Sequence, residues 1–189
     1  RVLFRSGSEV ASLQRLAQLG MFPAGWISVL SGLVSKRAAV LITGGTGVGK
    51  TTLAKALLAQ CDANDRIVTV EEVRELGDFG HGNHVSMAAR EANVEGEGAV
   101  GLPDLVKATL RMRPDRVVLG ECRGEEIVDL LRAFNSGHRG GMTTLHANSV
   151  AQVPKRLIAL GLLAGVAPHA LAMLAEGAFD TVQIGRAHV

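Results

Sequence analysis

Short apolar runs alternate along this chain with longer stretches in which apolar residues recur at helical spacing. Runs rich in Val, Ile and Leu predict strands at 39–43, 66–70, 84–88 and 116–121, and 140–144 and 181–182 are also β-prone. Helical spacing or helix-forming composition predicts helices at 8–20, 23–35, 50–60, 103–112, 125–134, 150–161 and 168–177. Strands that alternate with helices indicate an α/β fold with a mostly parallel sheet covered on both faces.

A glycine-rich segment joins the first predicted strand to the helix that follows it. It reads Gly44-Gly45-Thr46-Gly47-Val48-Gly49-Lys50-Thr51, with Thr52 continuing into the helix. Glycines let backbone N–H groups face a phosphate that a Cβ would obstruct, and the helix adds its positive dipole end. We expect Lys50 to neutralise β- and γ-phosphates and the Thr51 hydroxyl to bind Mg²⁺. The alternative is a glycine-rich turn that binds nothing.

Carboxylates end two of the other predicted strands. Glu121 closes the run Val117-Val118-Leu119-Gly120, and Glu71 and Glu72 follow Val70. Ligands of parallel sheets bind at the carboxyl ends of the strands, so one crevice could hold Lys50, Glu71 and Glu121. Glu121 could orient an attacking water or reach Mg²⁺ through water. Because side chains alternate along a strand, only one of Glu71 and Glu72 should face the crevice.

Histidines and arginines supply further candidates. His138 and His146 bracket a Gly/Thr-rich strand, which suggests a sensor for the γ-phosphate. Zinc binding is the competing hypothesis, but no Cys or third His has ligand spacing. Arg111, Arg113 and Arg123 surround the Glu121 strand and could be surface charges, internal ion pairs or arginine fingers acting on a neighbouring subunit.

The two ends of the chain resemble translated sequencing adapter. Residues 1–6 match the adapter and residues 184–189 match its reverse complement, so we expect the domain to comprise residues 7–183 of a longer protein. Lys and Arg number 20 against 18 acidic residues; without Arg1, Arg5 and Arg186 the basic count is 17, and the net charge is −1. This balance gives no support to a nucleic-acid or membrane partner.

Four motifs in order resemble those of the type II/type IV secretion ATPase superfamily. They are Gly44–Thr51 (Walker A), Val70–Leu76 (the acidic box), Arg111–Asp115 through Gly120–Gly124 (Walker B) and Gly137–Ser149 (the His box). Asn93-Val94-Glu95-Gly96-Glu97-Gly98 and Leu110-Arg111-Met112-Arg113-Pro114-Asp115-Arg116 are similar to the tight-adherence (Tad/Flp, CpaF-type) pilus branch.

The resemblance implies a RecA-like P-loop NTPase, with ATP hydrolysis and Mg²⁺, in a cytoplasmic homo-hexamer. The hexamer would drive an inner-membrane platform protein that assembles or retracts a pilus or secretes a substrate. By position it implies that Glu121 is the Walker B carboxylate, Glu71 the acidic-box carboxylate and His146 the γ-phosphate contact. Arg90, Arg111 and Arg123 match arginines of the family pattern.

The sequence departs from the family pattern in two positions and leaves three other functions to weigh. Glu72 stands where Asp is usual, and Ser86 stands where the branch often has Arg.

One alternative function is a conjugation-type motor that translocates DNA. The chain has no basic stretch interleaved with aromatic residues to support it, so no direct nucleic-acid contact is expected. A GTP switch lacks an Asn-Lys-x-Asp segment. An inactive interaction subunit is disfavoured by the intact Lys50, Thr51 and Glu121.

Overall fold

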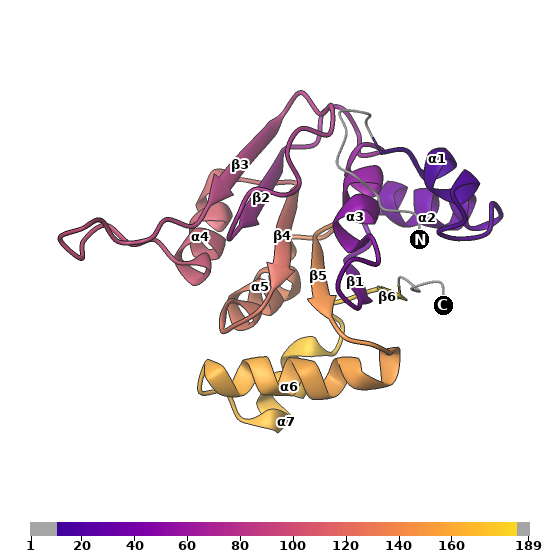
Figure 1. The fold of residues 1–189 in the computed structure, drawn as a ribbon. Helices are drawn as coiled ribbons and strands as arrows, with labels where there is room; N and C mark the ends of the chain where they lie inside the picture. The colour runs from indigo at the N-terminus through magenta and orange to yellow at the C-terminus, as the bar shows by residue number, and fades with distance from the viewer. Residues whose placement is uncertain (1–10, 185–189) are drawn as a thin grey trace.

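The computed structural model describes residues 11–184, which form a six-stranded sheet. Its strands are β1 (Val40–Gly44), β2 (Ile67–Glu71), β3 (His84–Ala88), β4 (Arg116–Cys122), β5 (Met142–His146) and β6 (Thr181–Ile184). Their order across the sheet is β3-β2-β4-β5-β1-β6, and every pairing is parallel. The predicted α/β class is confirmed, and the carboxyl ends of β1, β2, β4 and β5 share one edge (Figure 1).

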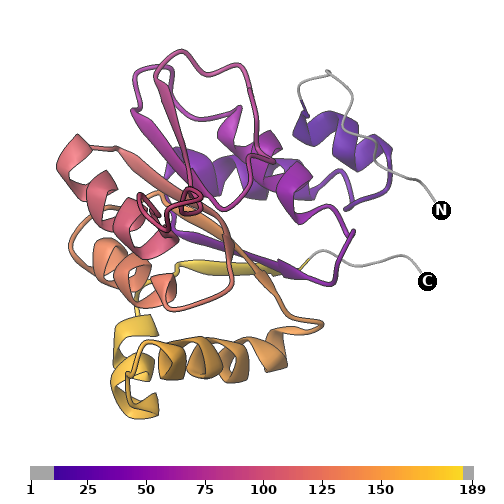
Figure 2. The ribbon, with the colours of Figure 1, turned by 60° about the vertical axis from the view of Figure 1, so that its left-hand side comes forward.

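Helices cover both faces of this sheet (Figures 1 and 2). The helices on one face are α1 (Leu13–Gln18), α2 (Trp26–Ser35) and α3 (Lys50–Leu58). Those on the other are α4 (Leu102–Thr109), α5 (Glu126–Asn135), α6 (Val153–Leu163) and α7 (Pro168–Ala175), with short 3-10 turns η1 (Leu110–Met112) and η2 (Val150–Gln152). The fold is therefore a three-layer sandwich with the sheet in the middle.

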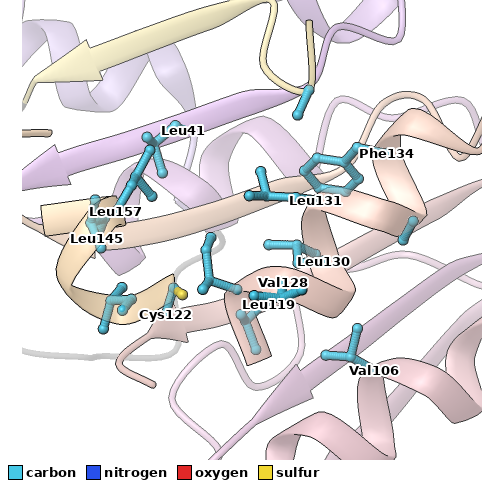
Figure 3. Close-up of a cluster of buried hydrophobic side chains, with 14 of the residues drawn as sticks. Leu41, Val106, Leu119, Cys122, Val128, Leu130, Leu131, Phe134, Leu145 and Leu157 are labelled. Carbon is cyan, nitrogen blue, oxygen red and sulfur yellow. The ribbon is translucent and has the colours of Figure 1, made fainter. Parts of the chain in front are cut away.

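The strands are apolar on both sides because both sides are buried. Val40 and Ile42 pack with α1, α2 and α3, whereas Leu41, between them, points to the opposite cluster. Figure 3 shows that second cluster, to which Leu41 and Leu119 belong together with the buried side chains of α5. Burial on both faces explains why these strands read as continuous apolar runs rather than alternating ones.

Three helices begin three or more residues after their predicted starts. The helix expected at 8–20 begins at Leu13, where the Oγ of Ser12 accepts a hydrogen bond from the Arg15 N–H; its residues 8–10 lie outside the described part. The helix expected from Pro23 begins at Trp26. Residues 150–152 form a 3-10 turn, and α6 begins at Val153 with proline in its first turn, where no N–H is needed.

The structure bears on one end of the expected domain, residues 7–183, because its last strand reaches residue 184. Strand β6 runs through Ile184, the first residue of the segment set aside as adapter-like, while residues 1–6 and 185–189 lie outside the described part. Within residues 11–184, no single helix has both the length and the apolar composition to cross a bilayer. One pair does on length and composition alone, Val150–Leu163 with Pro168–Ala175, and it is bent by 119°.

Candidate nucleotide-binding site

The glycine-rich loop leaves β1 and turns into α3 through backbone conformations that favour glycine. Gly47 has φ +75° and Gly49 has φ +91°, both in the left-handed region. A Cβ on Gly49 would also lie 2.5 Å from Cε of Met21. The sequence did not indicate this contact with Met21. It places the α1–α2 connection directly against the loop.

Lys50 and Thr51 occupy the first turn of α3. The Lys50 Nζ donates to the carbonyl oxygens of Gly44 and Gly45, at 3.1 and 2.9 Å. Burial lowers the pKa of Lys50; the Glu121 and Glu75 carboxylates oppose this shift, and the Arg123 guanidinium adds to it. The Thr51 Oγ1 donates to Oε2 of Glu75 at 3.3 Å. Both side chains thus point to the carboxyl edge of the sheet.

Glu71, the last residue of β2, is a buried carboxyl group that backbone N–H groups hold in place. One carboxylate oxygen, Oε1, accepts from the backbone N–H groups of Glu75 and Leu76, at 3.0 and 2.9 Å. The other, Oε2, is buried and has no hydrogen-bond partner in the protein. A buried carboxylate oxygen without a partner is costly, so its presence at a pocket indicates function.

Glycine at position 120 makes room for this carboxylate. A Cβ there would lie 2.8 Å from Cγ of Glu71 and 3.2 Å from its Oε1. The Thr144 Oγ1 donates to the Gly120 carbonyl at 2.8 Å and so ties β5 to β4 at this point. Gly120 is therefore a packing requirement for Glu71.

Glu121 projects from an irregular part of β4. The register with β5 shifts between Leu119 and Cys122, which places an extra residue in β4 where Glu121 stands. Bulges of this kind redirect side chains and occur next to active sites. The Glu121 carboxylate accepts from Nε of Arg123 at 2.7 Å, and Arg123 also pairs with Glu72 at 3.0 Å.

A buried carboxylate that the sequence analysis missed shapes the turn after β4. Glu126 is only 3% exposed, and its Oε1 accepts from the backbone N–H groups of Arg123 and Gly124, at 2.7 and 2.8 Å. It also raises the pKa of Cys122, although burial is the larger cause. An acidic residue at the first turn of a predicted helix was the available signal.

One pocket brings several predicted residues together at the carboxyl edge of the sheet. Its lining residues are Thr51, Glu71, Glu72, Val73, Glu75, Gly120, Glu121 and Arg123. The prediction that only one of Glu71 and Glu72 faces the crevice is wrong. Strand β2 ends at Glu71, so strict alternation no longer governs Glu72.

His146 and His138 are placed at opposite ends of β5. His146 ends the strand beside Gly44 in the register of β1 and β5, next to the glycine-rich loop. His138 precedes the strand and bonds Ala133 O at 3.3 Å, at the amino edge of the sheet. The interpretation of the two as one sensor is therefore wrong for His138. Asn148 also lies beside the loop, since its Oδ1 is 3.6 Å from the position of a Cβ on Gly45.

Two of the predicted arginines lie away from the pocket of their own chain. Arg111 is exposed in η1, before the amino end of β4, and so at the opposite edge from Glu121. Arg90 follows β3 and donates from Nε to the Gly98 carbonyl at 2.7 Å. Among the predicted arginines, Arg123 is the one that the structure brings to the pocket.

The three-layer parallel fold, with a strand–glycine loop–helix unit and carboxylates at neighbouring strand ends, defines a P-loop nucleotide-binding domain of the RecA-like class. The family model described as "Type II/IV secretion system protein" matches residues 1–177. The chain belongs to this family.

Curated relatives agree with this family. The chain is 48% identical over 166 residues, 88% of its length, to a Mycobacterium tuberculosis protein named "Putative conjugal transfer protein". It is 42% identical over 132 residues, 70% of its length, to the type IV secretion system protein PtlH of Bordetella pertussis. It covers 46% of the first relative and 39% of the second, so it spans less than half of each.

Solved structures agree as well. The VirB11 ATPase of the Brucella suis type IV secretion system, in complex with sulphate, is 31% identical with a TM-score of 0.73; the match covers 91% of this chain and 50% of that one. The pilus retraction motor PilT with bound ADP is 24% identical with a TM-score of 0.69, covering 93% and 48%, and shows the shared fold alone.

Proposed function

We propose that this chain binds ATP at Gly44–Thr51 and hydrolyses it as the motor part of a secretion-system ATPase. The observation that carries this proposal is the convergence of Thr51, Glu71 and Glu121 on one pocket beside the glycine-rich loop. Hydrolysis of a phosphoanhydride needs the phosphates neutralised and a water aligned with the leaving group. A loop that offers N–H groups and a pocket that offers carboxylates meet those two needs.

The residues divide this work according to their present contacts. Lys50 and the N–H groups of the loop, Thr46, Val48 and Thr52 included, hold the phosphates. Glu121 orients the attacking water and accepts its proton, and Glu71, whose Oε1 is held by two N–H groups, lines the same pocket as the second carboxylate. The ion pair with Arg123 fixes the orientation of Glu121 toward the same pocket. Attack of the water then yields ADP and inorganic phosphate.

Magnesium fits the donor atoms of this pocket. The Thr51 hydroxyl and the carboxylates of Glu75 and Glu121 are oxygen donors of the kind that Mg²⁺ prefers, and the Thr51–Glu75 contact already places two of them together. Thr51 would hold the ion directly and Glu121 directly or through water. When bound, the ion would neutralise charge that develops on the phosphates.

His146 and the arginines complete the proposal. His146 stands beside Gly44, from which its ring can contact the γ-phosphate. Arg111 and Arg90 lie away from the pocket of their own chain, so any contact with nucleotide would be made to a neighbouring subunit. We propose that they would do so within a homo-hexamer on the cytoplasmic side of the inner membrane, which works on a membrane platform protein.

The system that this motor serves has two candidates. The motifs at Asn93–Gly98 and Leu110–Arg116 favour the Tad/Flp pilus branch. The Mycobacterium tuberculosis relative is named as a conjugal transfer protein, which favours conjugal transfer. Hydrolysis that is stimulated by DNA and loses this stimulation at high salt would favour the conjugal candidate. Hydrolysis indifferent to DNA would favour the pilus candidate.

Two variants test the activity itself. Glu121→Gln should keep ATP binding and lower turnover by about 100-fold or more, as expected for loss of a group that acts in the transition state. Lys50→Ala should lose both binding and turnover. The exposed Glu125 offers a matched control, and Glu125→Gln should leave both unchanged. Turnover by Glu121→Gln within a few-fold of the parent would remove Glu121 from its role.

A further inference from the structure

A long arm projects from the β3 edge of the molecule. Residues 90–99 are all exposed, and the segment extends well clear of the helices and the sheet (Figure 1). We call residues 90–100 the arm. In Figure 2, with the left-hand side of Figure 1 turned forward, the same segment is seen in front of the body.

The arm has a defined shape even though residues 90–99 are all exposed. Arg90 and Val100 exchange two backbone hydrogen bonds, at 3.0 and 2.9 Å, which close its base. At its tip, Oδ1 of Asn93 accepts from the N–H groups of Glu95 and Glu97, at 3.0 and 2.9 Å. Ordering a segment costs conformational entropy, and an element ordered in advance binds a partner with less further loss.

The composition of the arm indicates what it would bind. Val94 is fully exposed at the tip, at 107% of its reference area, although Val is among the residues most often buried. Three acidic side chains accompany it, Glu91, Glu95 and Glu97, and the arginine of the arm is turned back onto Gly98. Its partner should therefore offer an apolar contact surrounded by positive charge.

Such a surface lies on helices α1 and α2. Trp26 and Val29 are 46% and 51% exposed on neighbouring turns of α2, and Lys36 caps the C-terminal end of that helix, seven residues after Val29. Arg15 is exposed on α1. Residues 11–37 contain no Asp or Glu. We call the exposed surface of these two helices, which carries Arg15, Trp26, Val29 and Lys36, the α1–α2 face.

The arm and the α1–α2 face lie on opposite sides of the molecule, so one copy cannot bring its own two surfaces together (Figure 1). We propose that the arm of one copy docks on the α1–α2 face of the next copy. This inference rests on the homo-oligomer of the proposed function and specifies its contact. Such a contact is head-to-tail, and head-to-tail contacts close into rings when the rotation allows.

Paired charge reversals test this contact in the full chain. The arm variant carries Glu95→Lys with Glu97→Lys, and the face variant carries Arg15→Glu with Lys36→Glu. Each variant alone brings like charges together, so its self-association should weaken by about tenfold or more. An equal mixture pairs each arm with an oppositely charged face, so assembly should return. Sedimentation velocity in low-salt buffer measures the assembly.

The control is Glu125→Lys with Glu176→Lys, an equal charge change on exposed residues outside both surfaces, which should assemble like the parent. Assembly retained by either reversal, or not restored in the mixture, would overturn the proposal, as would a parent that stays monomeric. Nucleotide binding by the same samples reports separately on the proposed function. If binding persists while restoration fails, only the arm contact is lost; if the parent binds no nucleotide, the proposed function itself fails.

Discussion

Lys50 illustrates how the environment of one residue sets the conditions for binding. Burial lowers its pKa below the ordinary lysine value of 10.5, with Glu121 and Glu75 opposing the shift and Arg123 adding to it. The side chain must be protonated to attract phosphate, so affinity for ATP is lost as the pH rises through the lowered pKa of the free protein. We therefore expect the alkaline decline in affinity to begin at a lower pH than an exposed lysine would give.

Titration of fluorescent ATP analogue binding across the alkaline range checks this expectation. Far-ultraviolet circular dichroism at each pH establishes that the fold persists. An affinity for the ATP analogue that stays constant up to pH 10.5 would contradict the lowered pKa. It would mean that the free protein stabilises the Lys50 ammonium instead of disfavouring it by burial.

The two cysteines give a second prediction at this scale. Burial raises the pKa of Cys61 from 9.0 to about 11, and burial raises that of Cys122 as well. Since the thiolate is the reactive form, a pKa two units higher leaves about 100-fold less thiolate in Cys61 at neutral pH. Both thiols should react slowly with iodoacetamide in the native protein and quickly in urea. Mass spectrometry of each cysteine follows the reaction, and rapid native labelling of Cys61 would contradict its burial.

At the scale of elements, the irregular part of β4 packs directly against the end of β2 and so positions the Glu71 carboxylate. Because residue 120 has no side chain, the Glu71 side chain can lie directly against the β4 backbone. Gly120→Ala would place a Cβ 2.8 Å from Cγ of Glu71. Glu71 must then move away from its two N–H partners. We expect Gly120→Ala to lower kcat at least ~10-fold, because misplacement of a catalytic group by about 1 Å has large effects, and to leave nucleotide affinity within a few-fold.

The matched control for that substitution is Gly32→Ala in α2, where no atom lies within 4 Å of the added Cβ. Steady-state ATP hydrolysis and equilibrium binding should be unchanged in this control. Parallel losses of binding and turnover in Gly120→Ala would indicate collapse of the pocket rather than displacement of Glu71.

The sequence predicted these elements better than it predicted their side chains. The glycine-rich loop and the apolar runs carry local signals, so the strands, the parallel sheet and the strand-end positions of Glu71 and Glu121 were predictable. The bulge at Glu121 was not, because it depends on the register of β4 with β5. His138 was misplaced although the strand between it and His146 was predicted, because a strand of this length, roughly 16 Å, holds the residues at its two ends apart.

At the scale of the whole molecule, the edge of the sheet opposite the pocket is joined by buried charges from distant segments. Asp65 accepts from Nε of Arg116 at 2.6 Å, and both side chains are almost wholly buried. Arg37 also donates to Asp65, and Arg116 donates to Val34 O at 3.0 Å. Local sequence gives no sign of this network, since its members are brought together only by the completed fold.

Asp65→Asn should therefore destabilise the domain as a whole. The substitution leaves the buried Arg116 guanidinium without its anion, and breaking a buried pair from one side costs about 3–5 kcal/mol. Asp115→Asn is the matched control, since that side chain is 39% exposed and its carbonyl oxygen can still accept from the Arg66 N–H. It should cost less than about 1 kcal/mol. Urea unfolding followed by circular dichroism gives the free energy of unfolding of each variant. If Asp65→Asn were as stable as Asp115→Asn, water or local rearrangement would have to satisfy the Arg116 guanidinium. Because the network lies at the far edge from the pocket, the surviving folded fraction should bind nucleotide like the parent, which separates this loss of stability from any loss of the site.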